Sequence, residues 1–165
     1  MVVLGVDPGS QVTGYGLLEK KHNRLVCINA GHITPSGKAP FYTRIHTIFK
    51  GIAEIIEKHH PDQMAIEDIF YARNVKSSLK LGHARGAVLV AAVQFGLEIF
   101  EYTPLEVKKS VVGYGRATKE QVRSMVKVIL GLKDIPGLDT SDALAVGICH
   151  LNWTRFEEKG GLKSP

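Results

Sequence analysis

Three apolar segments open the chain, at residues 2–6, 12–18 and 25–34. The first is apolar at nearly every position, which is typical of a central strand buried on both faces. A short polar turn with the sequence KKHNR separates the second segment from the third. Successive strands joined by short turns predict an antiparallel meander of three strands.

The next segment, residues 39–58, has the period of a helix. Apolar side chains recur there at the i, i+3, i+4 spacing of an amphipathic helix. These side chains are Ile45, Ile48, Phe49, Ile52, Ile55 and Ile56. Beyond them we predict a short buried strand at 63–68, a helix rich in small residues at about 75–95, and another strand at 97–102.

Helix-start signals mark the second half of the chain. The segments TPLE at 103–106 and TKEQ at 118–121 each resemble a capping box at the start of a helix. A final helix is predicted at about 140–156. Residues 157–165 lack apolar periodicity, so we expect a flexible tail there.

These elements predict an α/β fold. A meander followed by strands that alternate with helices gives a mixed five-stranded sheet, whose later strands run parallel through right-handed crossovers. Helices would cover both faces of this sheet. A chain of 165 residues fits one domain, which we place at residues 1–156.

Composition and charge narrow the class of protein. The content of 44% hydrophobic and 22% charged residues is typical of a globular protein, and the net charge of +5 favours a polyanionic partner. Cys27 and Cys149 lack the CxxC spacing of a zinc or redox site, so we interpret them as buried thiols in a reducing compartment. Neither a signal peptide nor a membrane-length apolar segment is evident, so we expect a cytoplasmic protein without membrane contact.

Four carboxylates stand at special places in this predicted fold. Asp7 ends the first strand and Glu67 ends the strand at 63–68, while Asp139 and Asp142 open the last helix and share one face. If the two strands are parallel neighbours, all of these acids meet at the carboxyl edge of the sheet. Clustered carboxylates need cations to neutralise them, and oxygen ligands suit Mg²⁺ or Mn²⁺. Two such ions can activate water against a phosphodiester.

Each acid also has a plain structural interpretation. The segment DTSD at 139–142 could cap a helix, and DPGS at 7–10 could form an ordinary turn. Glu67 competes with Asp68, which points to the opposite face of the strand, and the pattern alone does not choose between them. Only the joint placement of the acids favours a metal site.

A polar stretch at residues 68–74 contains Phe70. An exposed aromatic ring there is suited to stacking on an unpaired base, although the same ring could anchor the loop in the core. Two basic groups suit a surface that follows a phosphate backbone, although either could be a solvated face. The residues assigned to DNA contact are Phe70, Arg73, Asn74, Lys76, Lys80, Arg85, Lys108, Lys109, Arg116 and Lys119.

Gly82 and Gly86 lie inside the helix predicted at 75–95. Each costs that helix about 1 kcal/mol relative to alanine. Together with the neighbouring alanines they permit a close approach of another backbone. Packing of the helix on the sheet is the plain explanation for them.

Four motifs, in this order and spacing, resemble the RuvC family of bacterial Holliday junction resolvases. They are GVDPGSQVTGYG, IEDIFYARNVKSSLKLGHARG, TPLEVKKSVVGYGRATKEQV and DTSDALAVGICH. Together they cover nearly the whole chain as far as His150. The resemblance implies an RNase H-like fold in which Asp7, Glu67, Asp139 and Asp142 match the metal-binding acids of the family.

The resemblance also implies roles for other residues. Phe70 matches an aromatic residue that works at the junction crossover, and Lys108 and Lys119 match basic residues near the scissile strand. The helix with Gly82 and Gly86 matches the homodimer interface of the family, and a two-fold dimer suits a four-way junction. Members of the family work with the branch-migration proteins RuvA and RuvB.

The implied activity is that of a homodimeric, Mg²⁺-dependent endonuclease with two ions in each active site, for which Mn²⁺ can substitute. It would nick two opposing strands of a four-way DNA junction and leave ligatable 5′-phosphate ends, with Lys119 stabilising charge on the phosphate. Three alternatives stand beside it. They are an actin-like ATP-binding fold, which needs two related domains, a junction-binding protein without catalysis, and a related nuclease that acts on structured RNA.

Overall fold

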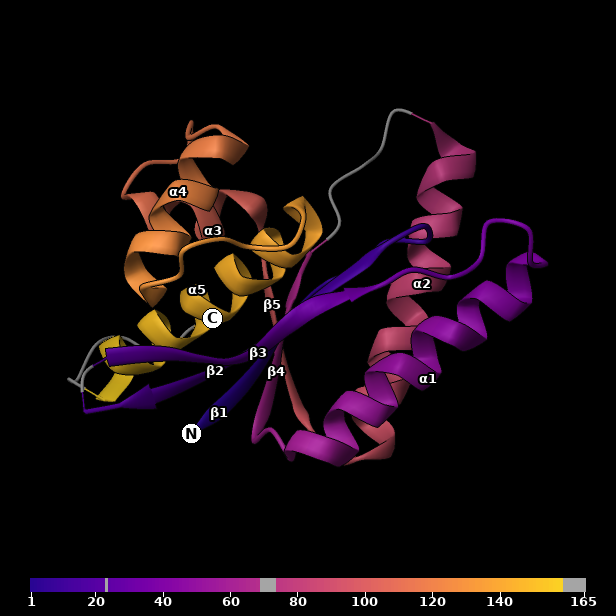
Figure 1. The fold of residues 1–165 in the computed structure, drawn as a ribbon, viewed down its shortest axis with the longest axis horizontal. Coiled ribbons are helices and arrows are strands. Elements are labelled where there is room, and N and C mark those ends of the chain that lie inside the picture. Colours follow the sequence, from indigo (N-terminus) through magenta and orange to yellow (C-terminus); the bar gives the residue numbers. More distant parts are fainter. Residues whose placement is uncertain (23, 69–73, 159–165) are drawn as a thin grey trace.

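The computed structural model describes residues 1–22, 24–68 and 74–158 (Figure 1). Its centre is a five-stranded sheet with the strand order β3-β2-β1-β4-β5. The strands are β1 (Val2–Asp7), β2 (Thr13–Lys21), β3 (Arg24–Ile33), β4 (Gln63–Glu67) and β5 (Glu98–Tyr102). The sheet is mixed and has helices on both faces, which confirms the predicted fold class.

β1 lies at the centre of the sheet, antiparallel to β2 and parallel to β4. In the parallel pair Val6 lies opposite Ile66, so Asp7 and Glu67 follow at the same edge of the sheet. In the antiparallel pair Asp7 lies opposite Gly14. The condition set for a meeting of Asp7 and Glu67, that the first and fourth strands are parallel neighbours, is therefore met.

The helices of the described part begin and end close to the predicted positions. They are α1 (Phe41–His59), α2 (Val75–Gln94), α3 (Pro104–Val112), α4 (Lys119–Leu130) and α5 (Leu138–Glu158). Both predicted capping boxes are present, with Thr103 capping α3 and Thr118 capping α4. These caps satisfy backbone N–H groups that would otherwise lack a partner at the helix starts.

α5 differs from the prediction at both ends. It begins at Leu138, directly after Gly137, whose positive φ turns the chain into the helix. Asp139 is therefore the second residue of the helix and not its cap. The helix continues to Glu158, past the expected end at residue 156, and the predicted tail from residue 159 onward lies outside the described residues.

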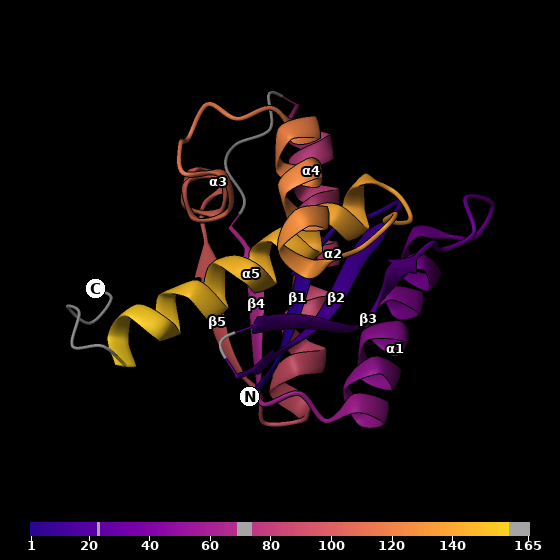
Figure 2. The ribbon, with the colours of Figure 1, turned by 60° about the vertical axis from the view of Figure 1, so that its left-hand side comes forward.

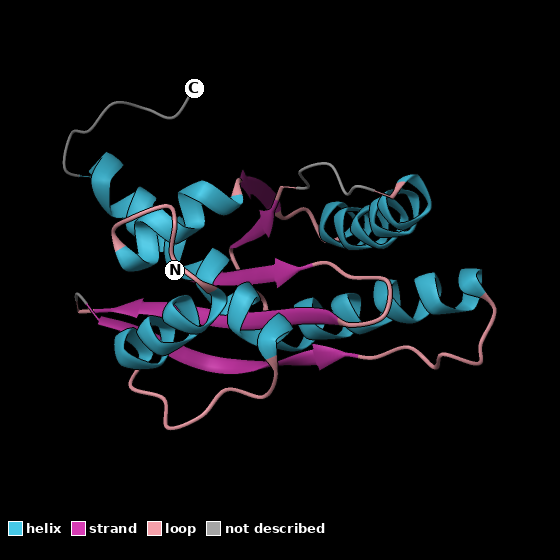
Figure 3. Ribbon diagram, turned by 90° about the horizontal axis from the view of Figure 1, so that it is seen from above, coloured by secondary structure: helices cyan, strands magenta, loops and turns pink. Residues whose placement is uncertain are grey.

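α1 and α2 cover one face of the sheet (Figures 1 and 3). Ile48 and Ile52 of α1 and Val88 of α2 pack with Leu4 and Val6 of β1. This layer explains the amphipathic period of α1, since its apolar side faces the sheet. No helix in the described part of the chain is long and apolar enough to span a bilayer.

α5 covers the other face and crosses the strands (Figure 2). Its residues Leu144 and Ile148 pack with Val3 and Leu18 of the sheet. α3 and α4 pack against α5, so this helix is enclosed between the sheet and other helices. The start of α5 therefore has a fixed place beside the ends of β1 and β4.

Candidate active site

Three elements bring the four acids to one edge of the sheet. Asp7 ends β1 and Glu67 ends β4, while Asp139 and Asp142 lie in the first two turns of α5. α5 approaches the sheet closely at Gly14, the residue opposite Asp7 on β2. A Cβ atom on Gly14 would lie only 2.0 Å from the carbonyl oxygen of Asp139, so no larger residue permits this approach.

The ionised form of Asp7 is strongly disfavoured relative to the protonated form at this position. Burial and three neighbouring carboxylates raise the pKa of Asp7 to about 8. Burial is the largest cause, followed by Glu67, Asp142 and Asp139, while Lys119 acts in the opposite direction. Asp7 therefore lies within electrostatic reach of each of the other three acids.

The structure separates Glu67 from Asp68, which the sequence pattern did not. Burial and the charge of Asp142 raise the pKa of Glu67, and Lys119 and Lys108 act to lower it. Asp68 instead lies 3.8 Å from the guanidinium of Arg85. Glu67 is thus the acid of this strand that shares the cluster with Asp7.

Lys119 is the basic residue in direct contact with the acids. Its Nζ donates a hydrogen bond of 2.7 Å to Oδ2 of Asp142, and this bond raises the pKa of Lys119. Lys119 is the first residue of α4, directly after the cap. A hollow of about 230 Å³ lies beside this contact. Its lining is Glu67, Pro104, Val107, Lys108, Lys119, Val122, Asp142 and Ala145.

The donor chemistry of the cluster fits a hard divalent cation. All four acids offer carboxylate oxygens, and positive charge near Asp7 would favour its ionised form. Among the described residues, no three His, Cys, Asp or Glu side chains are already grouped as ligands of one ion. The acids therefore form an electrostatic cluster and not a preformed ligand shell.

Several residues predicted to contact DNA lie at the surface. Lys108 lines the hollow beside the acids. The others with exposed side chains are Lys76, Lys80, Lys109, Arg116 and Lys119. Phe70 and Arg73 lie outside the described residues.

Asn74 and Arg85 are engaged within the protein. The side-chain oxygen of Asn74 caps α2 by accepting from the backbone N–H groups of Lys76 and Ser77. Arg85 is nearly buried, and its guanidinium contacts the carbonyl oxygen of Glu67 and two carboxylates. The prediction that Asn74 and Arg85 contact DNA gains no support from these positions.

One face of α2 is open to solvent. Gly82 and Gly86 lie on this face, and a Cβ atom on either would meet nothing within 4 Å. At about 100° per residue, four exposed apolar residues share the face with them. These residues are Val75, Leu79, Val90 and Val93. Packing on the sheet therefore does not explain the two glycines.

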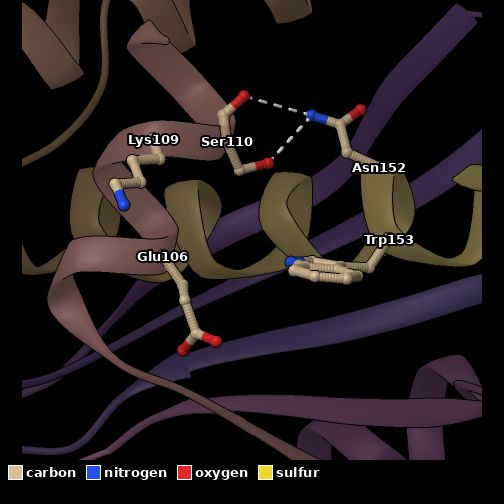
Figure 4. A pocket seen from close by; sticks show the side chains of 5 residues that line it. All are labelled: Glu106, Lys109, Ser110, Asn152 and Trp153. Atoms are coloured by element: carbon tan, nitrogen blue, oxygen red, sulfur yellow. Dashed lines mark hydrogen bonds between the residues drawn. The ribbon is translucent and has the colours of Figure 1, made fainter. Parts of the chain in front are cut away.

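A second hollow, of about 340 Å³, lies between α3 and the C-terminal half of α5 (Figure 4). Its lining is Glu106, Lys109, Ser110, Asn152 and Trp153. Here the amide nitrogen of Asn152 donates to the hydroxyl oxygen of Ser110 at 3.2 Å. The one carboxylate of the lining, Glu106, accepts from the backbone of Thr103. This hollow therefore lacks the clustered acids that would hold divalent cations.

Sequence reasoning missed two features of the site. The contact of Arg85 with the strand that carries Glu67 depends on how α2 packs, and no local pattern indicates it. The close approach of α5 at Gly14 does have a signal, since glycines inside the strand segment TGYG at 13–16 indicate that another backbone comes near.

The sequence is similar to one nuclease family over most of its length. The family model of crossover junction endodeoxyribonuclease RuvC matches residues 3–150. The curated RuvC of Geobacter metallireducens is 53% identical over 152 residues, which cover 92% of this chain and 93% of that protein. The RuvC of Halothermothrix orenii is 48% identical over 164 residues and 99% of both chains.

Solved structures show the same similarity. Thermus thermophilus RuvC in complex with a Holliday junction substrate superposes with a TM-score of 0.89 at 34% identity, over 95% of this chain and 96% of that chain. The yeast mitochondrial Holliday junction resolvase Ydc2 has a TM-score of 0.66 at 12% identity, over 95% of this chain and 83% of that chain. The likeness to the yeast protein concerns the fold alone.

Proposed function

The chain belongs to the RuvC family of crossover junction endodeoxyribonucleases, and we propose from this membership that it resolves Holliday junctions in recombination and DNA repair. It cuts two opposing strands at symmetric positions and leaves ligatable 5′-phosphate ends. The observation that carries this proposal is the cluster of four acids, drawn from β1, β4 and α5, beside Lys119. The burial and charge that raise the pKa of Asp7 to about 8 indicate a site built to receive positive charge.

The activity of this family depends on a metal ion, and Mg²⁺ is the ion that we propose for this chain. Asp7, Glu67, Asp139 and Asp142 would hold two ions in each active site, and Mn²⁺ would substitute. Bound divalent cations activate a water molecule and stabilise the charge that develops on the leaving oxygen of a phosphodiester. The all-oxygen donor set supports this choice over a thiol- or imidazole-binding metal.

Lys119 would stabilise negative charge on the scissile phosphate. Its ammonium group donates a hydrogen bond to Oδ2 of Asp142 at 2.7 Å, which supports a place for this charge beside the cluster. Lys108 lines the same hollow from α3 and would contact the phosphate backbone. Exposed basic residues on α2, α3 and the segment before α4 would continue this surface along the DNA. They are Lys76, Lys80, Lys109 and Arg116.

Phe70 would stack on a base at the junction crossover. Opening a base step costs a few kcal/mol, and stacking on an aromatic ring offsets about 1–3 kcal/mol of that cost. Phe70 lies outside the described residues, and its assignment depends on the family resemblance. Arg73, which also lies outside the described residues, is proposed as a phosphate contact of the same segment.

A homodimer would place two active sites on one junction. The open face of α2, with Gly82, Gly86 and exposed Val75, Leu79, Val90 and Val93, supports this helix as the interface. A two-fold dimer matches the symmetry of a four-way junction, so both opposing strands are reached at once. From the family we also propose that the dimer works in the cytoplasm with RuvA and RuvB.

The proposed function can be tested with synthetic four-way junctions that carry a labelled strand. We expect the purified chain to nick opposing strands when Mg²⁺ is present, and the products to be sealed by DNA ligase. Asp7→Asn should bind the junction but not cut it, because it removes the charge with little change of shape. Asp134→Asn is the matched control, since Asp134 is an exposed acid away from the cluster.

The choice of substrates separates the proposal from its alternatives. Duplex DNA and structured RNA of equal length should be cut far more slowly than the junction. Equal cutting of all substrates would indicate a general nuclease and not a junction resolvase. Preferred cutting of RNA would favour the related nuclease that acts on structured RNA. If the unmodified chain binds the junction but cuts no substrate, the interpretation as a junction-binding protein without catalysis holds.

A further inference from the structure

Arg85 reaches from α2 to the end of the strand that carries Glu67. Its side chain is only 12% exposed. Arginine is rarely buried unless its charge is paired, so the guanidinium should have partners inside the protein. Nη1 donates a hydrogen bond of 2.9 Å to the carbonyl oxygen of Glu67. The guanidinium therefore binds the backbone of a residue in the acid cluster, while Glu67 lines the hollow that Asp142 and Lys119 also line.

The second terminal nitrogen of the Arg85 guanidinium, Nη2, lies near two carboxylates. Nη2 forms an ion pair with Glu101 of β5 and lies 3.8 Å from Oδ1 of Asp68. The backbone N–H of Asp68 also donates to the carbonyl oxygen of Tyr102 at 2.7 Å. The chain directly after Glu67 is thus held from two directions, by β5 and by α2.

We propose that Arg85 is a positioning residue of the active site. It fixes the backbone of Glu67 and holds the carboxylate of Asp68 away from the cations. The inference depends on the proposed function in one respect, namely that Glu67 is a cation ligand. The planar fork of arginine suits this task because it can serve a carbonyl and carboxylates at the same time, which the single ammonium of lysine cannot do.

Loss of Arg85 has two expected effects on the cluster. Glu67 loses a backbone contact, so its carboxylate is less well oriented. Asp68 and Glu101 also lose their countercharge, which leaves unpaired acids next to the site. Residues that orient metal ligands without touching the metal are typically worth ten- to a hundredfold in metal affinity or activity.

The first test measures cation binding without DNA. Free Mn²⁺ is followed by electron paramagnetic resonance during titration of the unmodified chain, Arg85→Met and Arg85→Lys. We expect Arg85→Met to weaken Mn²⁺ binding about ten- to a hundredfold, and Arg85→Lys to weaken it less because the charge is retained. Asp7→Asn serves as the reference for the loss of a ligand itself.

Arg123→Met is the matched control for the removal of an arginine. Arg123 on α4 likewise donates to a backbone carbonyl, that of Ile135 at 2.7 Å, and to a carboxylate, that of Asp134 at 3.4 Å. We expect this variant to unfold at a lower temperature but to bind Mn²⁺ as the unmodified chain does. A general loss of stability is thereby separated from a loss of positioning.

The second test measures junction cutting at saturating protein. Arg85→Met should lower the single-turnover rate and raise the Mg²⁺ concentration for half-maximal cutting, while junction affinity in metal-free buffer stays within twofold of the unmodified chain. A large loss of metal-free junction affinity would make Arg85 a DNA contact and overturn the proposal. Wild-type Mn²⁺ affinity and cutting rate in folded Arg85→Met would overturn it as well.

A double variant tests the role of Asp68. If Arg85 restrains that carboxylate, Asp68→Asn combined with Arg85→Met should bind Mn²⁺ more tightly than Arg85→Met alone. No recovery would remove Asp68 from the proposal. If Arg85→Met does not fold, Arg85→Lys is the deciding variant. A Mn²⁺ affinity and a junction-cutting rate equal to those of the unmodified chain would then contradict the need for a guanidinium at this position.

These outcomes separate the inference from the proposed function. If the unmodified chain binds Mn²⁺ in an Arg85-dependent manner but cuts no junction, the proposed substrate is wrong and the positioning role stands. If it cuts junctions and Arg85→Met changes neither Mn²⁺ affinity nor rate, the positioning role is wrong and the function stands.

Discussion

The helices α2 and α5 both carry apolar residues around their circumference, yet they lie in different surroundings. Every residue of α5 from 143 to 151 is buried, because the sheet lies on one side and α3 and α4 on the other. α2 packs one side against the sheet and α1, and its other side presents exposed residues such as Val93, which is 66% exposed. A helix that is apolar all round needs cover all round. α5 receives that cover from its own chain, and α2 does not.

The glycines show the same difference at atomic scale. A Cβ atom on Gly5 of β1 would lie 2.2 Å from the carbonyl oxygen of Ala143 on α5, and one on Gly14 would lie 2.0 Å from that of Asp139. The glycines of α2, Gly82 and Gly86, face open space. Glycine beneath α5 thus serves a contact inside the chain, whereas the glycines of α2 have no such contact among the described residues.

This difference explains why the acids sit where they do. Asp139 and Asp142 are half-buried at the start of α5, directly before its enclosed part at 143–151. The open face of α2, which we propose as a dimer interface, is not enclosed in this way. The edge with the four acids and the open face of α2 can therefore be perturbed separately.

The largest effect is expected at the enclosed helix, from Asp142→Asn. The change removes one charge from the cluster and weakens the bond from Lys119, so cutting of junctions should fall about a thousandfold or more, equivalent to about 4 kcal/mol in the barrier. Asp142 lies past the first helical residues, so the melting temperature should change little. Junction cutting and circular dichroism provide the two measurements.

The opposite pattern would restore the helix-capping interpretation of Asp142. That interpretation expects a loss of about 1 kcal/mol in stability with the activity retained. Asp134→Asn is again the control, because Asp134 is exposed and pairs only weakly with Arg123 at 3.4 Å.

A smaller but clear effect is expected from Gly5→Ala, which tests the close contact between β1 and α5. The added methyl group has no space against the backbone of Ala143 and Gly147, so the helix must move. Overpacking of this kind typically costs about 1–3 kcal/mol of unfolding free energy. Denaturation in urea measures the loss, and an unchanged midpoint would show that α5 is less tightly seated than the structure indicates.

The stability of the folded chain should also depend on pH through Asp7. The pKa of Asp7 rises from 3.8 to about 8, so the folded chain keeps a proton that the unfolded chain releases. Stability therefore decreases as the pH rises between these two values. In EDTA, Asp7→Asn should melt several degrees above the unmodified chain at pH 8, and the difference should shrink at pH 5.

Scanning calorimetry at both pH values measures this difference. Addition of Mg²⁺ at pH 8 should raise the melting temperature of the unmodified chain but not that of Asp7→Asn, because a ligand that binds only the folded state stabilises it. An equal advantage of Asp7→Asn at both pH values would mean that shape and not charge is the cause.

The same contrast between the helices separates what the sequence could predict from what it could not. The mixed five-stranded sheet and both capping boxes follow from local patterns and the rule for parallel crossovers, and the structure confirms them. The parallel pairing of β1 and β4, which brings Asp7 to Glu67, is a condition that the sequence leaves open and the structure meets. The choice of Glu67 over Asp68 required the family resemblance, because both acids fit the same strand end. The inward course of Arg85 was missed, since the direction of a side chain on α2 depends on packing that no nearby residue encodes.

The smallest change in the stability of a single chain is expected on the open face, from Gly86→Leu. Nothing in the chain lies within 4 Å of a Cβ atom there, so the leucine meets no obstacle. Its better helix propensity should leave the monomer equally stable or up to about 1 kcal/mol more stable.

Two copies packed through this glycine could not approach as closely, so sedimentation should show a shift from dimer to monomer. Gly86→Leu should then nick junctions slowly and without pairing of the two cuts. A variant that stays dimeric and cuts in pairs would place the interface elsewhere, and α2 would differ from α5 only in being less well covered.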